Sequence, residues 1–166
     1  MLDRKRLGIY LNDHLGGSTT GVELAKRIRG ANEGNEYGVV LARVAQEIEE
    51  DRQALERLMD TFEIKRDHPK VIAGWVAEKV GRLKLNGQLI GYSPLSRLVE
   101  LEGLAIGITG KLSLWEALLE VADEDPRLDR AELTRLSERA DSQRAEVWRL
   151  RQRAAREAFV AKAPVA

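Results

Sequence analysis

The sequence predicts an all-α fold, and three observations support this class. Charged residues make up 33% of the chain and aromatic residues only 5%, with Ala, Leu, Glu and Arg abundant, which is typical of amphipathic helices. Apolar residues recur at intervals of three and four over long segments. Runs of alternating β-branched residues are nearly absent. The length of 166 residues suits one domain with a sizeable core, so we expect a single domain over about residues 1–160.

The composition also excludes several functional classes. Twenty-seven Lys and Arg residues balance twenty-seven Asp and Glu residues, so no net charge favours nucleic acid or an anionic membrane surface. The absence of cysteine excludes thiol catalysis, disulfides and Cys-based metal sites. No apolar stretch has the length of a signal-sequence core or a membrane span. We therefore expect a cytoplasmic protein that binds neither nucleic acid nor a membrane.

The first helix is expected over about residues 3–29, with Asp3 as its N-cap and Gly30 as its stop. Its inward stripe is apolar at both ends and polar or small in the middle. The stripe consists of Leu7, Leu11, His14, Ser18, Gly21, Ala25 and Ile28. The following connection, residues 30–35, is short and rich in turn residues, so the next helix should pack antiparallel against the first.

The second helix is expected over about residues 36–62, and its stripe contains one charged residue among apolar ones. The stripe consists of Tyr37, Leu41, Val44, Ile48, Asp51, Leu55, Leu58 and Phe62. In an antiparallel hairpin, each step up one helix is a step down the other, which brings a residue near position 14 opposite one near position 51. We therefore expect His14 and Asp51 to meet in the core.

A long connection should then lead to the third long helix. Within this connection we expect a short helix over about residues 69–84, with Pro69 in its first turn. Ser93 and Pro94 supply a capping hydroxyl and a proline at the first helical position, so a helix should run over about residues 94–122. We expect it to be continuous despite three internal glycines. Its stripe is wholly apolar and consists of Leu98, Leu101, Ala105, Ile108, Leu112, Trp115, Leu119 and Ala122.

The last helix is expected over about residues 127–159, restarted by Pro126, and residues 161–166 should form a frayed tail. Its stripe consists of Leu133, Leu136, Ala140, Gln143, Val147, Leu150, Ala154 and Ala158. The predicted helices make two antiparallel hairpins joined by a long crossover that contains the short helix. This arrangement is the ferritin-like variant of the four-helix bundle.

Several segments of the sequence resemble a group of uncharacterised bacterial ferritin-like proteins. The segments are Tyr10–Ser18, Glu47–Arg52, Trp75–Lys79 and Tyr92–Leu104. The resemblance covers most of the chain and implies a ferritin-like fold, without a known activity. The wider ferritin-like superfamily implies oxygen-dependent di-iron chemistry, with a Glu on each of two helices and a Glu-x-x-His motif on each of the other two.

The sequence departs from that di-iron pattern. Residues 47–50 read Glu-Ile-Glu-Glu where such a motif should end in His, and the last helix contains no His. On the third long helix, the central stripe positions Ala105 and Ile108 cannot bind a metal. The last helix has Gln143 at its centre. We therefore expect no complete di-iron site and no bound cofactor.

Candidate functional residues lie in the polar centre of the first hairpin. They are His14, Asp51, Ser18 and Glu47. One interpretation is structural, because a buried polar pair that satisfies its own hydrogen bonds can fix helix register without any chemistry. A small internal pocket lined by His14, Ser18, Gly21 and Asp51 would fit the same placement.

The alternative interpretation is a degenerate ferritin-like metalloprotein. In this interpretation the first hairpin holds iron or manganese through His14, Glu47, Glu50 and Asp51. An imidazole beside carboxylates is a suitable ligand for such metals. The two interpretations differ in whether the polar centre binds a metal ion.

The expected function is that of a non-enzymatic bundle, acting through a small ligand or through contacts with an unknown protein partner or another copy of itself. Trp75 and Trp115 lie on packing sides of their helices and should be buried. Trp148 lies beside the last stripe among arginines, so it is the best aromatic candidate for an exposed interface.

Overall fold

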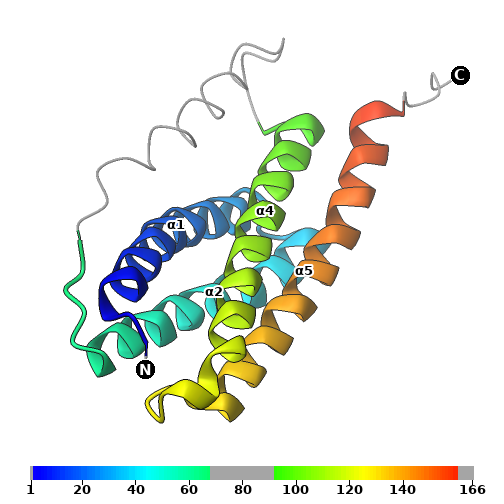
Figure 1. The fold of residues 1–166 in the computed structure, drawn as a ribbon. Coiled ribbons are helices and arrows are strands. Elements are labelled where there is room, and N and C mark those ends of the chain that lie inside the picture. Colours follow the sequence, from blue (N-terminus) through cyan, green and yellow to red (C-terminus); the bar gives the residue numbers. More distant parts are fainter. Residues whose placement is uncertain (1, 68–91, 161–166) are drawn as a thin grey trace, which may run out of the picture.

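All regular elements are helices in the computed structural model, which describes residues 2–67 and 92–160 and confirms the all-α class (Figure 1). The expected crossover helix at 69–84, Trp75 and the tail at 161–166 lie outside the described residues. The elements are α1 (Arg4–Ala31), α2 (Glu36–Thr61), α4 (Pro94–Glu120), the short 3-10 helix η1 (Ala122–Glu124) and α5 (Arg130–Phe159). The four long helices lie within a few residues of their predicted bounds.

Two of the predicted helix starts are confirmed by their capping hydrogen bonds. The Asp3 carboxylate accepts from the backbone N–H groups of Lys5 and Arg6, each at 3.1 Å. The Ser93 hydroxyl accepts from the N–H of Ser96 at 3.0 Å, and a proline follows Ser93 directly. These caps satisfy N–H groups that the first helical turn leaves free, so local sequence is sufficient to place both starts.

The prediction that Gly30 ends the first helix is wrong, because α1 continues to Ala31. Asn32 provides the C-cap: its backbone N–H reaches the carbonyl oxygens of Arg29 and Gly30. Its buried side-chain amide donates to the Ile28 carbonyl at 2.8 Å. The side chain thus satisfies a carbonyl at the helix end, and the glycine is not needed as a stop.

The boundaries between the third and fourth long helices also differ from the prediction. α4 ends at Glu120, and η1 follows it as a separate turn rather than as its last residues. α5 begins at Arg130 instead of residue 127, because Asp129 is its N-cap. The Asp129 carboxylate accepts from the N–H groups of Ala131 and Glu132 at 2.9 and 3.2 Å. The capping carboxylate, not Pro126, therefore sets the start of the last helix.

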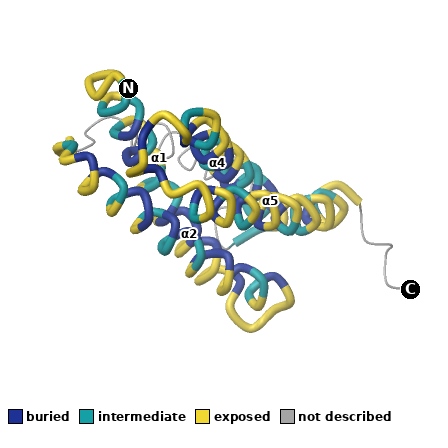
Figure 2. The backbone as a smooth tube through the Cα atoms, turned by 60° about the horizontal axis from the view of Figure 1, so that its bottom comes forward, coloured by how far each residue is buried: buried dark blue, intermediate teal, exposed yellow. Residues whose placement is uncertain are grey.

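The core is divided into two apolar clusters, one toward each end of the bundle. The first cluster contains Leu11, Leu15, Leu55, Met59, Phe62, Leu114, Trp115, Leu118 and Leu136. The second contains Val22, Ile28, Leu41, Val44, Ile48, Leu101, Leu104, Ile108 and Val147. Ser18, Asp51, Lys111 and Gln143 lie between the two clusters along their helices. Figure 2 shows the buried positions following the sides of the helices that face one another.

The helices pack in a closed set of neighbours. α1 packs against α2 and α4, while α5 packs against α4 and α2 (Figure 1). Arg27 on α1 forms an ion pair with Glu100 on α4 at 2.8 Å.

Within the two described ranges, the helices lack the combination of length and apolar character that crossing a membrane requires.

Gly38 in the first turns of α2 packs directly on the preceding connection. A Cβ atom at this position would overlap the backbone carbonyl oxygen of Asn32, so the turn would have to shift. We expect Gly38→Ala to lower the free energy of unfolding by about 1–3 kcal/mol in urea denaturation followed by circular dichroism. Gly107→Ala is the control, because a Cβ there meets nothing within 4 Å and the change should stabilise α4 by up to about 1 kcal/mol. Equal urea midpoints for Gly38→Ala and the wild type would contradict the close approach.

Candidate functional site

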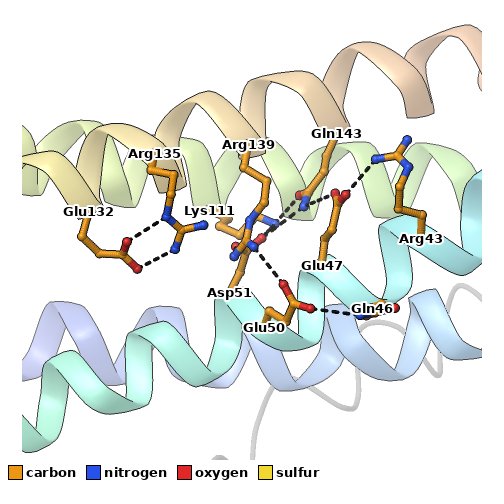
Figure 3. A network of polar contacts seen from close by, with 10 residues as sticks. All are labelled: Arg43, Gln46, Glu47, Glu50, Asp51, Lys111, Glu132, Arg135, Arg139 and Gln143. Atoms are coloured by element: carbon orange, nitrogen blue, oxygen red, sulfur yellow. Dashed lines mark hydrogen bonds and ion pairs between the residues drawn. The ribbon is translucent and has the colours of Figure 1, made fainter.

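Asp51 on α2 is the centre of a buried polar network at the middle of the bundle. Its side chain is only 1% exposed. The carboxylate accepts from the Lys111 ammonium of α4 and from the Arg139 guanidinium of α5. The Gln143 side-chain amide on α5 donates to the same carboxylate at 3.3 Å. Figure 3 shows these three side chains pointing toward Asp51 from two other helices.

Lys111 is the cation that joins the network to α4. Its side chain is 14% exposed, and its ammonium donates to both Asp51 and the side-chain oxygen of Gln143. Burial lowers the pKa of Lys111, while the Asp51 carboxylate beside it acts in the opposite direction. Sequence reasoning missed this residue, although one signal was available: Lys111 is the only Lys or Arg between Arg97 and Arg127.

The network extends outward along α2 through two glutamates. Glu47 accepts from Gln143 at 3.0 Å and from Arg43 at 2.8 Å. Glu50 accepts from Arg139 at 2.9 Å. Glu47, one of the candidate residues named from the sequence, therefore joins the polar layer and contacts Gln143 of α5. Glu47, Glu50 and Asp51 thus each bind a cation or an amide, which comes from α2 itself, from α4 or from α5.

The structure does not assemble the ligand set of the alternative metal interpretation. That set was His14, Glu47, Glu50 and Asp51. The three acids bind basic and amide groups instead, and no group of three or more His, Asp or Glu side chains in residues 2–67 and 92–160 is arranged to hold a metal ion. Lys111 and Arg139 supply positive charge at the place where a metal would have to lie between the carboxylates.

A pocket of about 190 Å³ lies between α1, α2 and α4 beside this network. His14, Ser18, Gly21 and Asp51 all line it, which agrees with the predicted membership of an internal pocket. The opposite wall comes from α4, where Gly103, Gly107, Gly110 and Lys111 line the same space. A Cβ atom at Gly17, Gly21, Gly107 or Gly110 would meet nothing within 4 Å. The pocket therefore exists because both helices lack side chains at these positions.

His14 and Asp51 share this pocket, but the expected direct pairing is replaced by other contacts. His14 is half-buried and its ring makes an edge contact with Tyr10, with centroids 4.6 Å apart. The polar partners of Asp51 come from α4 and α5. Burial lowers the pKa of His14, and the nearby Asp13 carboxylate opposes this shift, so the imidazole is neutral near pH 7.

The tryptophans of the described residues divide as the sequence predicts. Trp115 is 1% exposed and lines the pocket, and its indole N–H has no acceptor among the described residues. Trp148 is 50% exposed, and the guanidinium of Arg151 lies 4.4 Å from its ring centroid. Trp148 thus belongs to the outer surface of α5, whereas Trp115 belongs to the core beside the pocket.

A second buried carboxylate, Glu100, lies on α4 away from this pocket. Its ion pair with Arg27 joins α4 to α1, and its side chain is only 1% exposed. Burial raises the pKa of Glu100, and Arg27 opposes the shift. Glu100 does not line the pocket and does not contribute to the Asp51 network. In the structure, Glu100 connects α4 to α1.

Comparisons of the chain with family models, curated proteins and solved structures found no match. The ferritin-like resemblance therefore stays a prediction, and the proposals below rest on the geometry of the helices, the Asp51 network and the pocket.

Proposed function

We propose that this chain is a ferritin-like bundle in which basic side chains replace the metal centre, and that it binds a small ligand in the pocket between α1, α2 and α4. The observation that carries the proposal is this pocket, which has glycine-lined walls on α1 and α4 and polar groups from the Asp51 network at one side. A fold with this site is suited to binding rather than to metal-dependent oxidation.

The order of the interhelical contacts supports the ferritin-like arrangement. Residue numbers rise along one helix as they fall along its partner in each pair. The supporting pairs are Arg27 with Glu100 and Leu24 with Gly103 for α1 and α4, and Glu36 with Arg153 and Glu50 with Arg139 for α2 and α5. If neighbours are antiparallel, the end of α2 and the start of α4 lie at opposite ends of the bundle (Figure 1). A long crossover between them is the feature that separates this arrangement from a simple up-and-down bundle.

The Asp51 network explains why such a bundle would need no metal. In a di-metal bundle, inward carboxylates require cations, and the metal ions supply that charge. Here Lys111 and Arg139 supply it. Gln143 accepts from Lys111 and donates to Glu47 and Asp51. Buried charges that are paired and hydrogen-bonded in this way are stable without a bound ion. The acids of α2 are therefore structural in this proposal.

The size and lining of the pocket indicate what it can hold. An apolar cavity of about 150 Å³ in another protein accepts one benzene molecule, so a space of about 190 Å³ suits a single ring or a short branched chain. Ile48, Leu55, Leu104 and Trp115 provide apolar contact surface. The pocket is too small for a nucleotide or another drug-sized ligand, whose pockets usually span about 300–1,000 Å³.

Filling the pocket should abolish its capacity to bind. We expect fluorobenzene, followed by fluorine NMR, to bind the wild-type protein, and we expect Gly107→Leu to weaken the affinity by at least about tenfold because a leucine occupies the space of the ring. Gly30→Leu is the matched control, since it makes the same change on α1 outside the pocket, where a Cβ also meets nothing within 4 Å. The proposal fails if the wild type does not bind the probe, or if both variants bind it equally well.

A further inference from the structure

We infer that the ligand of this pocket is electrically neutral and carries a hydroxyl or carbonyl oxygen that hydrogen-bonds to His14. The inference rests on the proposed binding function and adds the chemical class of the ligand. It follows from two properties of the pocket wall: its buried charges already have partners, whereas the His14 imidazole and the Trp115 indole N–H have no hydrogen-bond partner among the described residues.

The charged groups on the pocket wall balance one another. They are Asp13 on α1, Asp51 and Arg52 on α2, and Lys111 on α4. Asp51 is paired with Lys111, and Arg52 donates to Glu49 at 3.1 Å and to Glu56 at 2.6 Å. The remaining group, Asp13, is exposed, so its carboxylate faces water. A charged ligand would have to leave water and would find no unpaired opposite charge among the buried groups of the wall. Breaking a buried pair to make one available leaves the other member uncompensated, which is strongly unfavourable.

The polar hydrogen-bonding groups of the wall are mostly occupied too. The Ser18 hydroxyl donates to the Leu15 carbonyl at 2.8 Å, and Lys111 and Asp51 are engaged with each other. Among the described residues, no hydrogen bond to either ring nitrogen of His14 is found, and its only ring contact is the edge contact with Tyr10. A neutral imidazole has one N–H donor and one nitrogen acceptor. His14 is therefore the wall group that offers a ligand both a donor and an acceptor without displacing an existing partner.

The chemistry of the ligand follows from what His14 offers. A hydroxyl group can both donate to and accept from a neutral imidazole, whereas a carbonyl oxygen can accept from its N–H. Trp115, on the same wall, also has an indole N–H without an acceptor in the described part of the chain. An oxygen atom on an otherwise apolar, single-ring ligand would supply the missing acceptor while the ring contacts the aliphatic wall.

Four probes of nearly equal size test this inference: benzyl alcohol, toluene, benzoate and benzylammonium. Binding is measured near pH 7.5 by two-dimensional amide NMR titration of the full chain. We expect benzyl alcohol to bind about three- to tenfold more tightly than toluene because of one added hydrogen bond. Both ionic probes should bind at least about tenfold more weakly than benzyl alcohol.

Two variants assign the preference to His14. His14→Leu should remove the advantage of benzyl alcohol over toluene while leaving toluene binding within about twofold, because the apolar wall is kept. His14→Gln should retain the advantage, since its amide also offers a donor and an acceptor. Thermal unfolding by circular dichroism checks that both variants are folded before any titration is interpreted.

The outcomes separate the inference from the function on which it rests. Equal wild-type affinities for toluene and benzyl alcohol, tight binding of an ionic probe, or an unchanged preference in His14→Leu would overturn the inference. In those cases the binding function still stands if Gly107→Leu blocks toluene. If none of the four probes binds the wild type, the proposed function itself fails and the inference fails with it.

Discussion

Asp51→Ala is expected to lower the free energy of unfolding by about 3–5 kcal/mol, the usual effect of removing one partner from a buried charge pair. The change removes the carboxylate that joins Lys111 to Arg139 and leaves two cations facing each other across the core. The side chains of both cations are largely buried, so water can compensate only in part. The cost arises from the two stranded charges more than from the lost contacts.

Urea unfolding followed by circular dichroism measures this effect. Asp141→Ala is a matched control, because Asp141 is exposed on α5 and its ion pair within the described part of the chain is with Arg144, one turn away at 2.6 Å. That surface pair should contribute less than about 1 kcal/mol. If the two aspartate variants unfold at the same urea concentration, the Asp51 network does not hold the bundle together in the way described.

Trp115→Ala should have an effect of similar size, about 3–5 kcal/mol, for a different reason. Among the described residues, Trp115 is the largest fully buried side chain, and it packs in the first apolar cluster. It also forms part of the wall between that cluster and the pocket. Its removal would join a new cavity to the existing one, so the neighbouring side chains could not close the space by small shifts.

Circular dichroism is again the measurement for Trp115→Ala, because the substitution removes a fluorescent residue. Trp148→Ala provides the same chemical change at a half-exposed position, where the ring contacts Arg151 on the surface. We expect the loss at Trp148 to be less than about 1.5 kcal/mol. A larger loss at Trp148 than at Trp115 would contradict the assignment of Trp115 to the core.

The helices could be predicted from sequence because their signals are local. Asp3, Ser93 and Pro94 act on the turn that immediately follows them, and apolar spacing identifies the inward face. The errors occurred where several local signals competed. The sequence pattern favours Gly30 as the end of α1, whereas in the structure the buried Asn32 amide satisfies the Ile28 carbonyl at the helix end. How deeply a capping side chain is buried depends on tertiary packing, which the local spacing of residues does not reveal.

The candidate site could be predicted only in part, because its parts come from helices that are distant in sequence. Counting along one hairpin brought His14 and Asp51 to the same level, and both line the pocket. The same counting says nothing about α4 and α5, whose placement depends on packing between hairpins. Lys111 and Arg139 were therefore missed, even though they determine the charge state of the layer and leave His14 without a carboxylate partner.

The pairing of one carboxylate, Asp51, with two cations, Lys111 and Arg139, has a consequence for how this sequence can diverge. Loss of Asp51 alone leaves two cations without their shared carboxylate, whereas joint replacement of all three by apolar residues of similar volume is often neutral or stabilising. Related chains that lack Asp51 should therefore also lack Lys111 and Arg139. We therefore expect the two cations to depend on Asp51 in evolution, although the three positions lie on separate helices and as many as 88 positions apart along the chain.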